Sequence, residues 1–321
     1  MTAVVANQDI HIAMGADEGY ALPLAAALAS LDDASRADRV IVHILHERFS
    51  QALRDKVAAR LTHLEIDWVR IDAGSLAGAS FPSFLSVGTL YRLLLGEVLP
   101  AGIHRVLYLD ADTLITDSVA ELFAAELHGN AIAAVRDAST PWAACMLGSP
   151  WRQWNMDPAS PYFNAGVLLI DLDRWRTEQI GQRSIELLKS FTPRWGDQDA
   201  LNAIIGSRWQ QLPRRWNMQT PLPLGDSPDW ALWSDDAHAA LEAPAVVHFT
   251  GLDKPWGVGS THPFTPLWRE WLDRTAWAGW RPSEPQPGLL ERLSRAAVRR
   301  ARAVREAARR RAAAKRLTNF G

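Results

Sequence analysis

The sequence has 321 residues, of which 48% are hydrophobic, with a net charge of −2 and a single cysteine, Cys145. The length exceeds that of one average domain, the hydrophobic content is ample for a core, and one cysteine excludes an intramolecular disulfide. The first nine residues lack the features of a signal peptide, and no uncharged stretch reaches the ~20 residues that span a bilayer. We therefore expect a cytoplasmic protein without a membrane-spanning segment.

Strands and helices alternate through the first part of the chain, as in a parallel sheet. The expected elements are strands at 10–14, 39–45 and 65–71, with helices ending near 31 and covering 50–61. Ligands of such sheets bind at the carboxyl ends of strands. In the loop after the first strand, Gly15 would permit close approach of a ligand, and Asp17 could accept hydrogen bonds from a base or ribose. This loop lacks the dinucleotide pattern G-x-G-x-x-G, so alone it predicts little.

One predicted helix lies before the strand expected at 106–109, and another lies after it. The first covers 89–96, and Arg92 is its only charge. Such an arginine either reaches along the surface to solvent or points at an anion in a cleft. Before the second helix, Ser118 and Glu121 have the spacing of a capping box.

An aliphatic run at 106–109 ends in two carboxylates, Asp110 and Asp112. The run predicts a strand buried on both faces, and neither aspartate has a place in such a core. At the end of a strand, the pair predicts a site for Mg²⁺ or Mn²⁺ bridged to substrate phosphates. An isolated Asp-x-Asp more often opens a turn, so this interpretation depends on companion motifs.

Three further motifs lie in the second half of the chain. Asn164 precedes Ala165 and Gly166, and it is either a turn residue or a polar group held over a ligand. Asp197-Gln198-Asp199 opens a short helix, where either aspartate can be a cap but the glutamine has no capping role. A strand at 245–249 contains His248, and Gly251 and Lys254 follow it. Gly251 could bind phosphate through its backbone N–H and Lys254 through its charge.

Together these motifs resemble glycosyltransferase family 8, the retaining GT-A-fold group that includes bacterial lipooligosaccharide galactosyltransferases and glycogenin. The resemblance covers about 10–256 and implies an α/β, Rossmann-like fold of a nucleotide-diphospho-sugar transferase, with a mixed, mainly parallel sheet. We expect a transferase domain at 1–280, with a nucleotide-sugar half at about 10–170 and an acceptor half at 171–280. A proline linker and basic tail at 281–321 would follow.

The resemblance also implies roles for individual residues. Mn²⁺, with Mg²⁺ as the alternative, would be bound by Asp110, Asp112 and His248. The UDP-sugar donor would contact Gly15, Ala16, Asp17, Arg92, Asp110, Ala111, Asp112, Asn164, Ala165, Gly251 and Lys254. Gln198 would lie by the anomeric carbon, with Asp197 at the donor sugar. Front-face attack by the acceptor and double displacement through Asp197 or Asp199 both remain open.

The implied activity is retaining transfer of galactose or glucose from a UDP-sugar to a saccharide acceptor, such as a lipooligosaccharide or lipopolysaccharide core. Three alternatives remain: a glycogenin-like or other glucosyltransferase with a non-lipid acceptor, a metal-dependent phosphohydrolase, and a catalytically silent UDP-sugar-binding protein. The phosphohydrolase is disfavoured because no nucleophile motif accompanies the single Asp-x-Asp.

The tail differs sharply from the body in charge. Residues 289–321 contain 11 basic and 2 acidic side chains, whereas 1–288 contain 23 basic and 34 acidic ones. Apolar residues recur on one helical stripe opposite arginines, a pattern typical of a helix in a membrane interface. We expect the tail to bind the anionic inner face of the membrane, close to a lipid-linked acceptor; a solvated basic tail is the alternative, and no nucleic-acid partner is expected.

Overall fold

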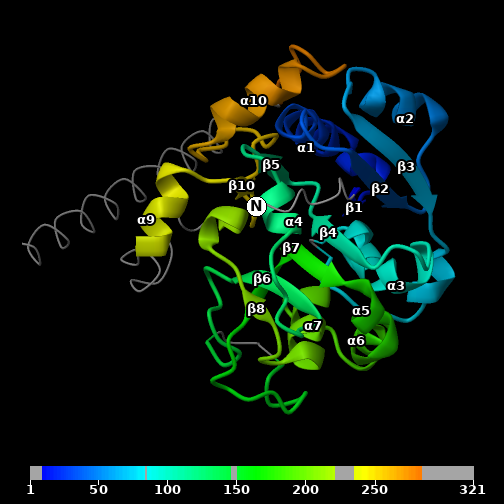
Figure 1. Cartoon of the computed structure of the whole chain (residues 1–321), viewed down its shortest axis with the longest axis vertical. Coiled ribbons are helices and arrows are strands. Elements are labelled where there is room, and N and C mark those ends of the chain that lie inside the picture. The colour runs from blue at the N-terminus through cyan, green and yellow to red at the C-terminus, as the bar shows by residue number, and fades with distance from the viewer. Residues whose placement is uncertain (1–8, 84, 146–149, 221–234, 284–321) are drawn as a thin grey trace, which may run out of the picture. The chain divides into compact units, whose positions relative to one another are not determined.

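The computed structural model describes residues 9–83, 85–145, 150–220 and 235–283 (Figure 1). Contacts between Cα atoms divide the chain into a compact unit, Met1–Trp280, and a second unit, Arg281–Gly321. The predicted amphipathic helix of the tail lies outside the described residues. Within those residues, no helix is both long and apolar enough to cross a membrane.

A seven-stranded sheet in the order β3-β2-β1-β4-β7-β6-β8 organises the compact unit. Strand β7 runs antiparallel to both of its neighbours, β4 and β6, whereas the other pairs described in this sheet are parallel. The sheet is therefore mixed and mainly parallel, as the sequence predicted. Its strands are β1 (Ile10–Gly15), β2 (Val40–His46), β3 (Leu64–Arg70), β4 (Arg105–Leu109), β6 (Ile132–Arg136), β7 (Phe163–Asp171) and β8 (Gln210–Gln211).

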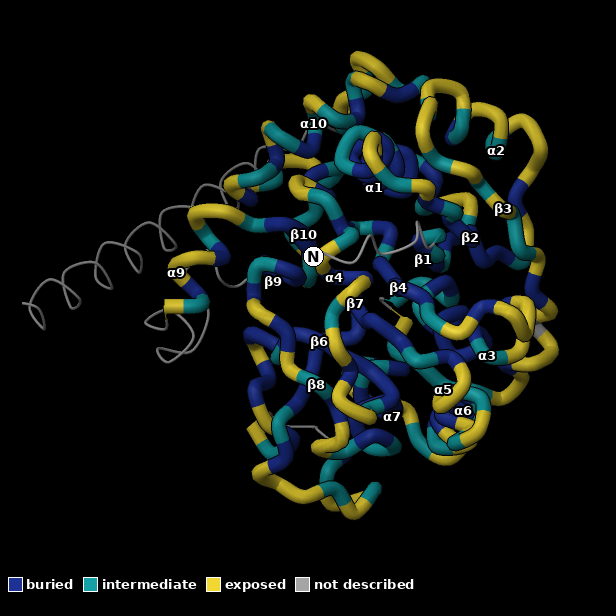
Figure 2. Tube along the Cα trace, viewed as in Figure 1, coloured by how far each residue is buried: buried dark blue, intermediate teal, exposed yellow. Residues whose placement is uncertain are grey.

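Apolar side chains on both faces bury the central strands, which are dark along most of their length in Figure 2. On one face, Leu107 and Leu109 of β4 pack in a cluster with helix α1 (Ala21–Ala34). On the other, Val106 and Tyr108 pack with the 3₁₀ helix η3 (Val87–Leu94) and with helices α6 (Ile180–Ser190) and α7 (Asp197–Ile205). Successive residues of a strand point to opposite faces, so an unbroken apolar run fits this position.

A small second sheet continues from the end of β4. Its order is β5-β10-β9, formed by β5 (Thr113–Ile115), β10 (Val246–His248) and β9 (Met218–Gln219). Strands β5 and β10 are antiparallel, and the register pairs His248 with Thr113. The backbone N–H of Phe249 also donates to the carbonyl of Asp112 at 3.0 Å. This sheet therefore brings His248 beside the predicted carboxylates.

Shorter elements and helices surround the two sheets. They are η1 (Glu18–Tyr20), α2 (Gln51–Ala58), η2 (Ala73–Leu76), α3 (Leu95–Val98), α4 (Ala120–Phe123), α5 (Leu172–Thr177), η4 (Arg214–Asn217), α9 (Asp235–Glu242) and α10 (Thr265–Asp273). The predicted helix at 89–96 is mostly the 3₁₀ helix η3. The capping box at Ser118 was wrong: its hydroxyl accepts from the N–H of Ala120 at 3.2 Å rather than from Glu121, and α4 begins after Val119.

Candidate active site

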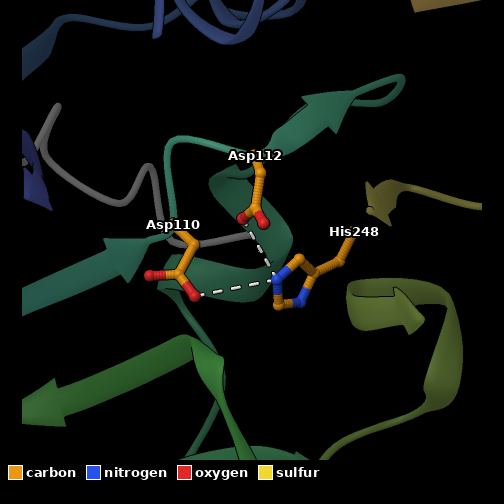
Figure 3. Close-up of side chains that lie close together, drawn as sticks. All are labelled: Asp110, Asp112 and His248. Carbon is orange, nitrogen blue, oxygen red and sulfur yellow. Dashed lines mark ion pairs between the residues drawn. The ribbon is translucent and has the colours of Figure 1, made fainter. Parts of the chain in front are cut away.

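Two aspartates and a histidine converge where β4 ends. His248 Nε2 lies 3.2 Å from Asp112 Oδ1 and 3.6 Å from Asp110 Oδ2. Figure 3 shows the three side chains turned toward one another, and their ligand atoms all lie within 4.8 Å of one another. The side chains of Asp110, Asp112 and His248 are 20%, 12% and 4% exposed. The structure thus brings together the three residues predicted to bind metal.

This donor set fits a divalent ion. Ligand atoms held about 2.1 Å from an octahedral ion lie about 3 Å apart, close to the 3.2 and 3.6 Å that separate His248 Nε2 from the two carboxylates. Two carboxylates suit Mg²⁺ or Mn²⁺, and the imidazole nitrogen favours the transition metal. Burial acts to raise the pKa of Asp112, but the neighbouring Lys254 and His248 outweigh it and lower the pKa below its usual range. The carboxylate is therefore held ionised, as a metal ligand must be.

Lys254 and Gly251 lie on the loop after β10. Lys254 Nζ donates to Asp112 Oδ2 and to the carbonyl of Phe249, each at 2.5 Å. Gly251 has a φ of 78°, which glycine adopts without strain, and no heavy atom beyond its chain neighbours lies within 4 Å of where a side chain would begin. The loop thus offers a cation beside the carboxylates and a glycine whose backbone a ligand can approach.

Arg92 is buried beside Asp110, with 3% of its side chain exposed, so it does not reach along the surface to solvent. Its Nη2 donates to Asp110 Oδ1 at 2.9 Å, and its Nε lies 2.8 Å from Asp197 Oδ2. Nη1 donates to the carbonyl of Ala165, and the guanidinium stacks over the Tyr108 ring at 4.5 Å. Arg92 therefore connects β4, β7 and α7 and fixes two carboxylates; its predicted contact with the donor stays a prediction.

Gln198 is partly exposed, whereas the aspartates on either side of it are buried. Its Oε1 accepts from the backbone N–H of Ala165 at 3.0 Å, and its Nε2 donates to Asp137 Oδ2 at 3.2 Å. Asn164 donates to the same oxygen at 3.1 Å from inside strand β7, so it is not a turn residue. The side chains of Gln198 and Asn164 are thus held by one carboxylate.

Asp137 was not among the predicted site residues, although its position in the sequence pointed to such a role. It directly follows β6, just as Asp110 directly follows β4. The argument that an acid after a buried strand belongs to a ligand site applies equally to both positions. Tyr108 was also missed: its hydroxyl donates to Asp110 Oδ1 at 3.0 Å. No sequence pattern distinguishes this tyrosine from an ordinary core residue.

The aspartates beside Gln198 both contact the protein. Asp199 accepts from the Tyr162 hydroxyl at 2.6 Å and from the Trp195 backbone N–H at 2.7 Å. Burial raises the pKa of Asp199 to about 6, although these two hydrogen bonds favour the ionised form and lower the pKa. Burial likewise raises the pKa of Asp197 to about 6, opposed by Arg92. An attack by Asp199 would require it to leave these hydrogen-bond partners, and an attack by Asp197 would separate its charge from that of Arg92.

Gly15, Ala16 and Asp17, which were predicted to contact the UDP-sugar donor, lie at the same edge of the sheet. Strands β1 and β4 are parallel neighbours, with Ala13 paired to Tyr108, so Gly15–Asp17 and Asp110–Asp112 leave adjacent strands together. Asp17 accepts from the N–H of Tyr20 at 3.1 Å and from the Ser86 hydroxyl. At Gly15 a Cβ would lie 2.4 Å from the carbonyl of Gly88, so this glycine is required for close packing with η3. Ala16 and Ala111 are buried, at 1% and 4% exposed.

Comparison with known proteins gives the family. The model of glycosyl transferase family 8 matches residues 11–258. General stress protein A of Bacillus subtilis is 26% identical over 84% of this chain and 96% of its own length. Lipopolysaccharide 1,3-galactosyltransferase of Salmonella typhimurium is 26% identical over 84% of this chain and 79% of its own length. Lipopolysaccharide 1,2-glucosyltransferase of Escherichia coli is 23% identical over 84% of this chain and 80% of its own length.

A solved structure agrees with this result. The galactosyltransferase LgtC, in complex with donor and acceptor sugar analogues, superposes with a TM-score of 0.68 at 27% identity, over 87% of this chain and 98% of that chain. The sheet order and the family match together identify a GT-A fold. The matched residues 11–258 contain Asp110, Asp112 and His248, called the strand-end cluster below, together with Gln198 and Lys254. This chain therefore belongs to glycosyltransferase family 8 and is a sugar-transferring enzyme.

Proposed function

We propose that the enzyme transfers galactose or glucose from a UDP-sugar to a saccharide acceptor, with retention of anomeric configuration and with Mn²⁺ as its cofactor. The observation that carries this proposal is the convergence of Asp110, Asp112 and His248, with Lys254 within hydrogen-bond distance of the same cluster. The names of two relatives, a lipopolysaccharide 1,2-glucosyltransferase and a lipopolysaccharide 1,3-galactosyltransferase, support a hexose donor and a lipopolysaccharide acceptor.

The charged residues would assist departure of the diphosphate. Breaking the bond between the anomeric carbon and phosphate leaves negative charge on UDP. A divalent ion held by Asp110, Asp112 and His248 would stabilise that charge when bound. Lys254, already fixed beside Asp112, would add a positive charge without a large rearrangement. Arg92 would keep Asp110 in place through its hydrogen bond.

Gln198 would face the anomeric centre with a neutral oxygen. Its Oε1 takes one hydrogen bond, from the N–H of Ala165, and an amide oxygen has a second lone pair. That lone pair could stabilise positive charge on the sugar while the acceptor hydroxyl attacks from the face that UDP leaves. The contacts of Asp197 with Arg92, and of Asp199 with Tyr162, favour this front-face route over double displacement.

The rival functions make different demands on the site. A silent binding protein would not need Gln198 oriented by two hydrogen bonds. A glycogenin-like enzyme that glucosylates its own tyrosine would need an accessible one. All four tyrosines of the chain lie within the described residues; those at 91, 108 and 162 are at most 1% exposed, and Tyr20 is partly buried and packs edge-on against Trp256. A separate saccharide is therefore the acceptor that we propose.

A donor panel tests the proposal. We would incubate the protein with UDP-galactose, UDP-glucose and UDP-N-acetylglucosamine in Mn²⁺, and follow UDP release. The configuration of the first sugar product would be read by NMR after removal of the metal. We expect turnover of one of the two hexose donors and an α product. Release with neither UDP-galactose nor UDP-glucose would refute the proposed donor, and a β product would refute the proposed stereochemistry.

We further propose that the basic tail binds the anionic cytoplasmic leaflet and that the acceptor is lipid-linked. Support comes from the sequence, in which 289–321 carry 11 basic and 2 acidic side chains. Each basic residue near such a surface contributes about 1 kcal/mol. Sedimentation with anionic and zwitterionic liposomes would compare the full chain with one ending at Trp280. The full chain alone should pellet, and only with anionic liposomes at low salt; equal pelleting of both chains would refute the anchor.

A further inference from the structure

We propose that Asn217 is a positioning residue that fixes the tautomer and orientation of His248. This inference rests on the proposed role of His248 as a metal ligand. Asn217 ends the 3₁₀ helix η4 and is 1% exposed. Its Oδ1 lies 2.9 Å from His248 Nδ1, whereas the other ring nitrogen, Nε2, faces Asp110 and Asp112. A neutral imidazole binds metal through the nitrogen without hydrogen, so the partner of the other nitrogen decides which one can coordinate.

The direction of the hydrogen bonds around Asn217 is fixed from outside. Asn164 Oδ1 accepts from the backbone N–H of Gly166 at 3.0 Å, and a backbone N–H can only donate. Asn164 Nδ2 donates to Asp137 at 3.1 Å. Asp137 also accepts from Gln198 and from two backbone N–H groups, as a carboxylate does. The amide of Asn164 therefore cannot be reversed.

The orientation of the Asn164 amide determines that of the Asn217 amide. Asn217 Nδ2 donates to Asn164 Oδ1 at 2.9 Å, which leaves Asn217 Oδ1 to face His248. An amide oxygen only accepts, so His248 Nδ1 must carry the hydrogen. The lone pair of Nε2 is then directed at Asp112 and Asp110, 3.2 and 3.6 Å away. This is the arrangement that a metal-binding histidine requires.

Asp137, which holds Asn164, also orients the proposed catalytic glutamine, Gln198. Gln198 Nε2 donates to the Asp137 oxygen that also holds Asn164. A continuous chain of hydrogen bonds therefore joins His248, Asn217, Asn164, Asp137 and Gln198. A change at Asn217 should act first on His248, which it contacts directly.

Three variants separate this role from a merely structural one. Asn217→Leu removes both hydrogen bonds. Asn217→Asp keeps an acceptor for His248 Nδ1 but loses the donor to Asn164. Asn202→Leu is the matched control, since Asn202 is also 1% exposed and makes three hydrogen bonds, to Phe163 and Gln198, none of them to His248.

Two measurements would be made on each variant. Electron paramagnetic resonance of unbound Mn²⁺, with UDP present, gives metal affinity. Nitrogen-15 NMR of histidine, on metal-free protein in alkaline buffer, gives the tautomer of His248. We expect Asn217→Leu to weaken Mn²⁺ binding by about 10–100-fold and to lose the single Nδ1–H tautomer. Asn217→Asp should bind Mn²⁺ like the wild type at a lower melting temperature, and Asn202→Leu should lower only the melting temperature.

Wild-type Mn²⁺ affinity in Asn217→Leu, or equal losses in the aspartate and leucine variants, would overturn the proposal. So would a wild-type His248 with its hydrogen on Nε2, a result that needs no variant to fold. If the wild type binds no Mn²⁺, the proposed function fails instead, and the wild-type tautomer still tests the inferred hydrogen bond separately.

Discussion

Gly166 offers a sharp test because one methyl group there would contact two proposed metal ligands. The residue lies within β7, and its φ is not positive, so alanine suits its backbone. On backbone grounds alone, Gly166→Ala should stabilise the protein by about 0.4–1 kcal/mol. The new Cβ, however, would lie 2.1 Å from His248 Cε1 and 2.7 Å from Asp110 Oδ2.

The expected losses of Mn²⁺ affinity and of stability in Gly166→Ala follow from these distances. Carbon atoms pack at about 3.5–4.0 Å, so the imidazole or the strand must move by more than about 1 Å. Metal sites keep their ligand distances within about 0.2 Å. We therefore expect Mn²⁺ affinity to fall by at least about 10-fold. Overpacking costs about 1–3 kcal/mol, which outweighs the backbone gain, so the free energy of unfolding should also fall.

Calorimetric titration of Mn²⁺ in the presence of UDP, together with thermal unfolding, measures both effects. Gly102→Ala is the control, because no heavy atom beyond its chain neighbours lies within 4 Å of a Cβ at that position. The control should bind Mn²⁺ like the wild type. If Gly166→Ala also binds Mn²⁺ with wild-type affinity and keeps its turnover, Asp110 and His248 do not hold the ion together, and the reasoning is refuted.

The remaining predictions concern three side chains. Lys254→Met removes the ammonium that contacts Asp112, so calorimetry should show tighter binding of Mn²⁺ alone but weaker binding of UDP; two changes in the same direction would contradict this placement. Gln198→Ala should lower kcat far more than UDP affinity, and it should also lower the free energy of unfolding by about 1–3 kcal/mol, because the buried N–H of Ala165 loses its acceptor. A loss of UDP affinity with unchanged kcat would be the wrong outcome. Burial raises the pKa of Asp199 from 3.8 to about 6, so this group contributes stability at low pH that is lost as pH rises through about 6. The free energy of unfolding of Asp199→Asn, measured with denaturant, should therefore rise relative to that of the wild type by up to about 3 kcal/mol between pH 4 and 7. A difference that does not change with pH would argue against an ionisable buried Asp199.

Much of the fold followed from local pattern, because buried strands read as apolar runs and their ends read as polar residues. The run at 106–109 predicted β4, and the acids after it predicted the strand-end cluster. The same rule would have found Asp137. Asn164 was less predictable, because small residues beside it are typical of turns as well as of tightly packed strands. Its place within β7 follows from pairing with β6, which no local pattern reveals.

Contacts between distant segments account for the rest. Arg92 had two interpretations, and burial against Asp110 and Asp197 decided between them. Asn217 had no signal at all, because its hydrogen bond to His248 spans 31 residues and depends on how η4 packs beside β10. Donor and acceptor directions within a polar network are set by every member together. They cannot be read from any one stretch of sequence.

The measurement that tests the central claim most directly is metal-dependent UDP release from the preferred hexose donor. Wild-type protein and Asp112→Ala would be assayed in Mn²⁺, in excess EDTA, and in EDTA followed by excess Mn²⁺, with melting temperatures as a check on folding. We predict that the wild type loses activity in EDTA and regains it with Mn²⁺, while Asp112→Ala stays folded and inactive throughout. Full activity of the wild type in EDTA, or of Asp112→Ala in Mn²⁺, would contradict the account.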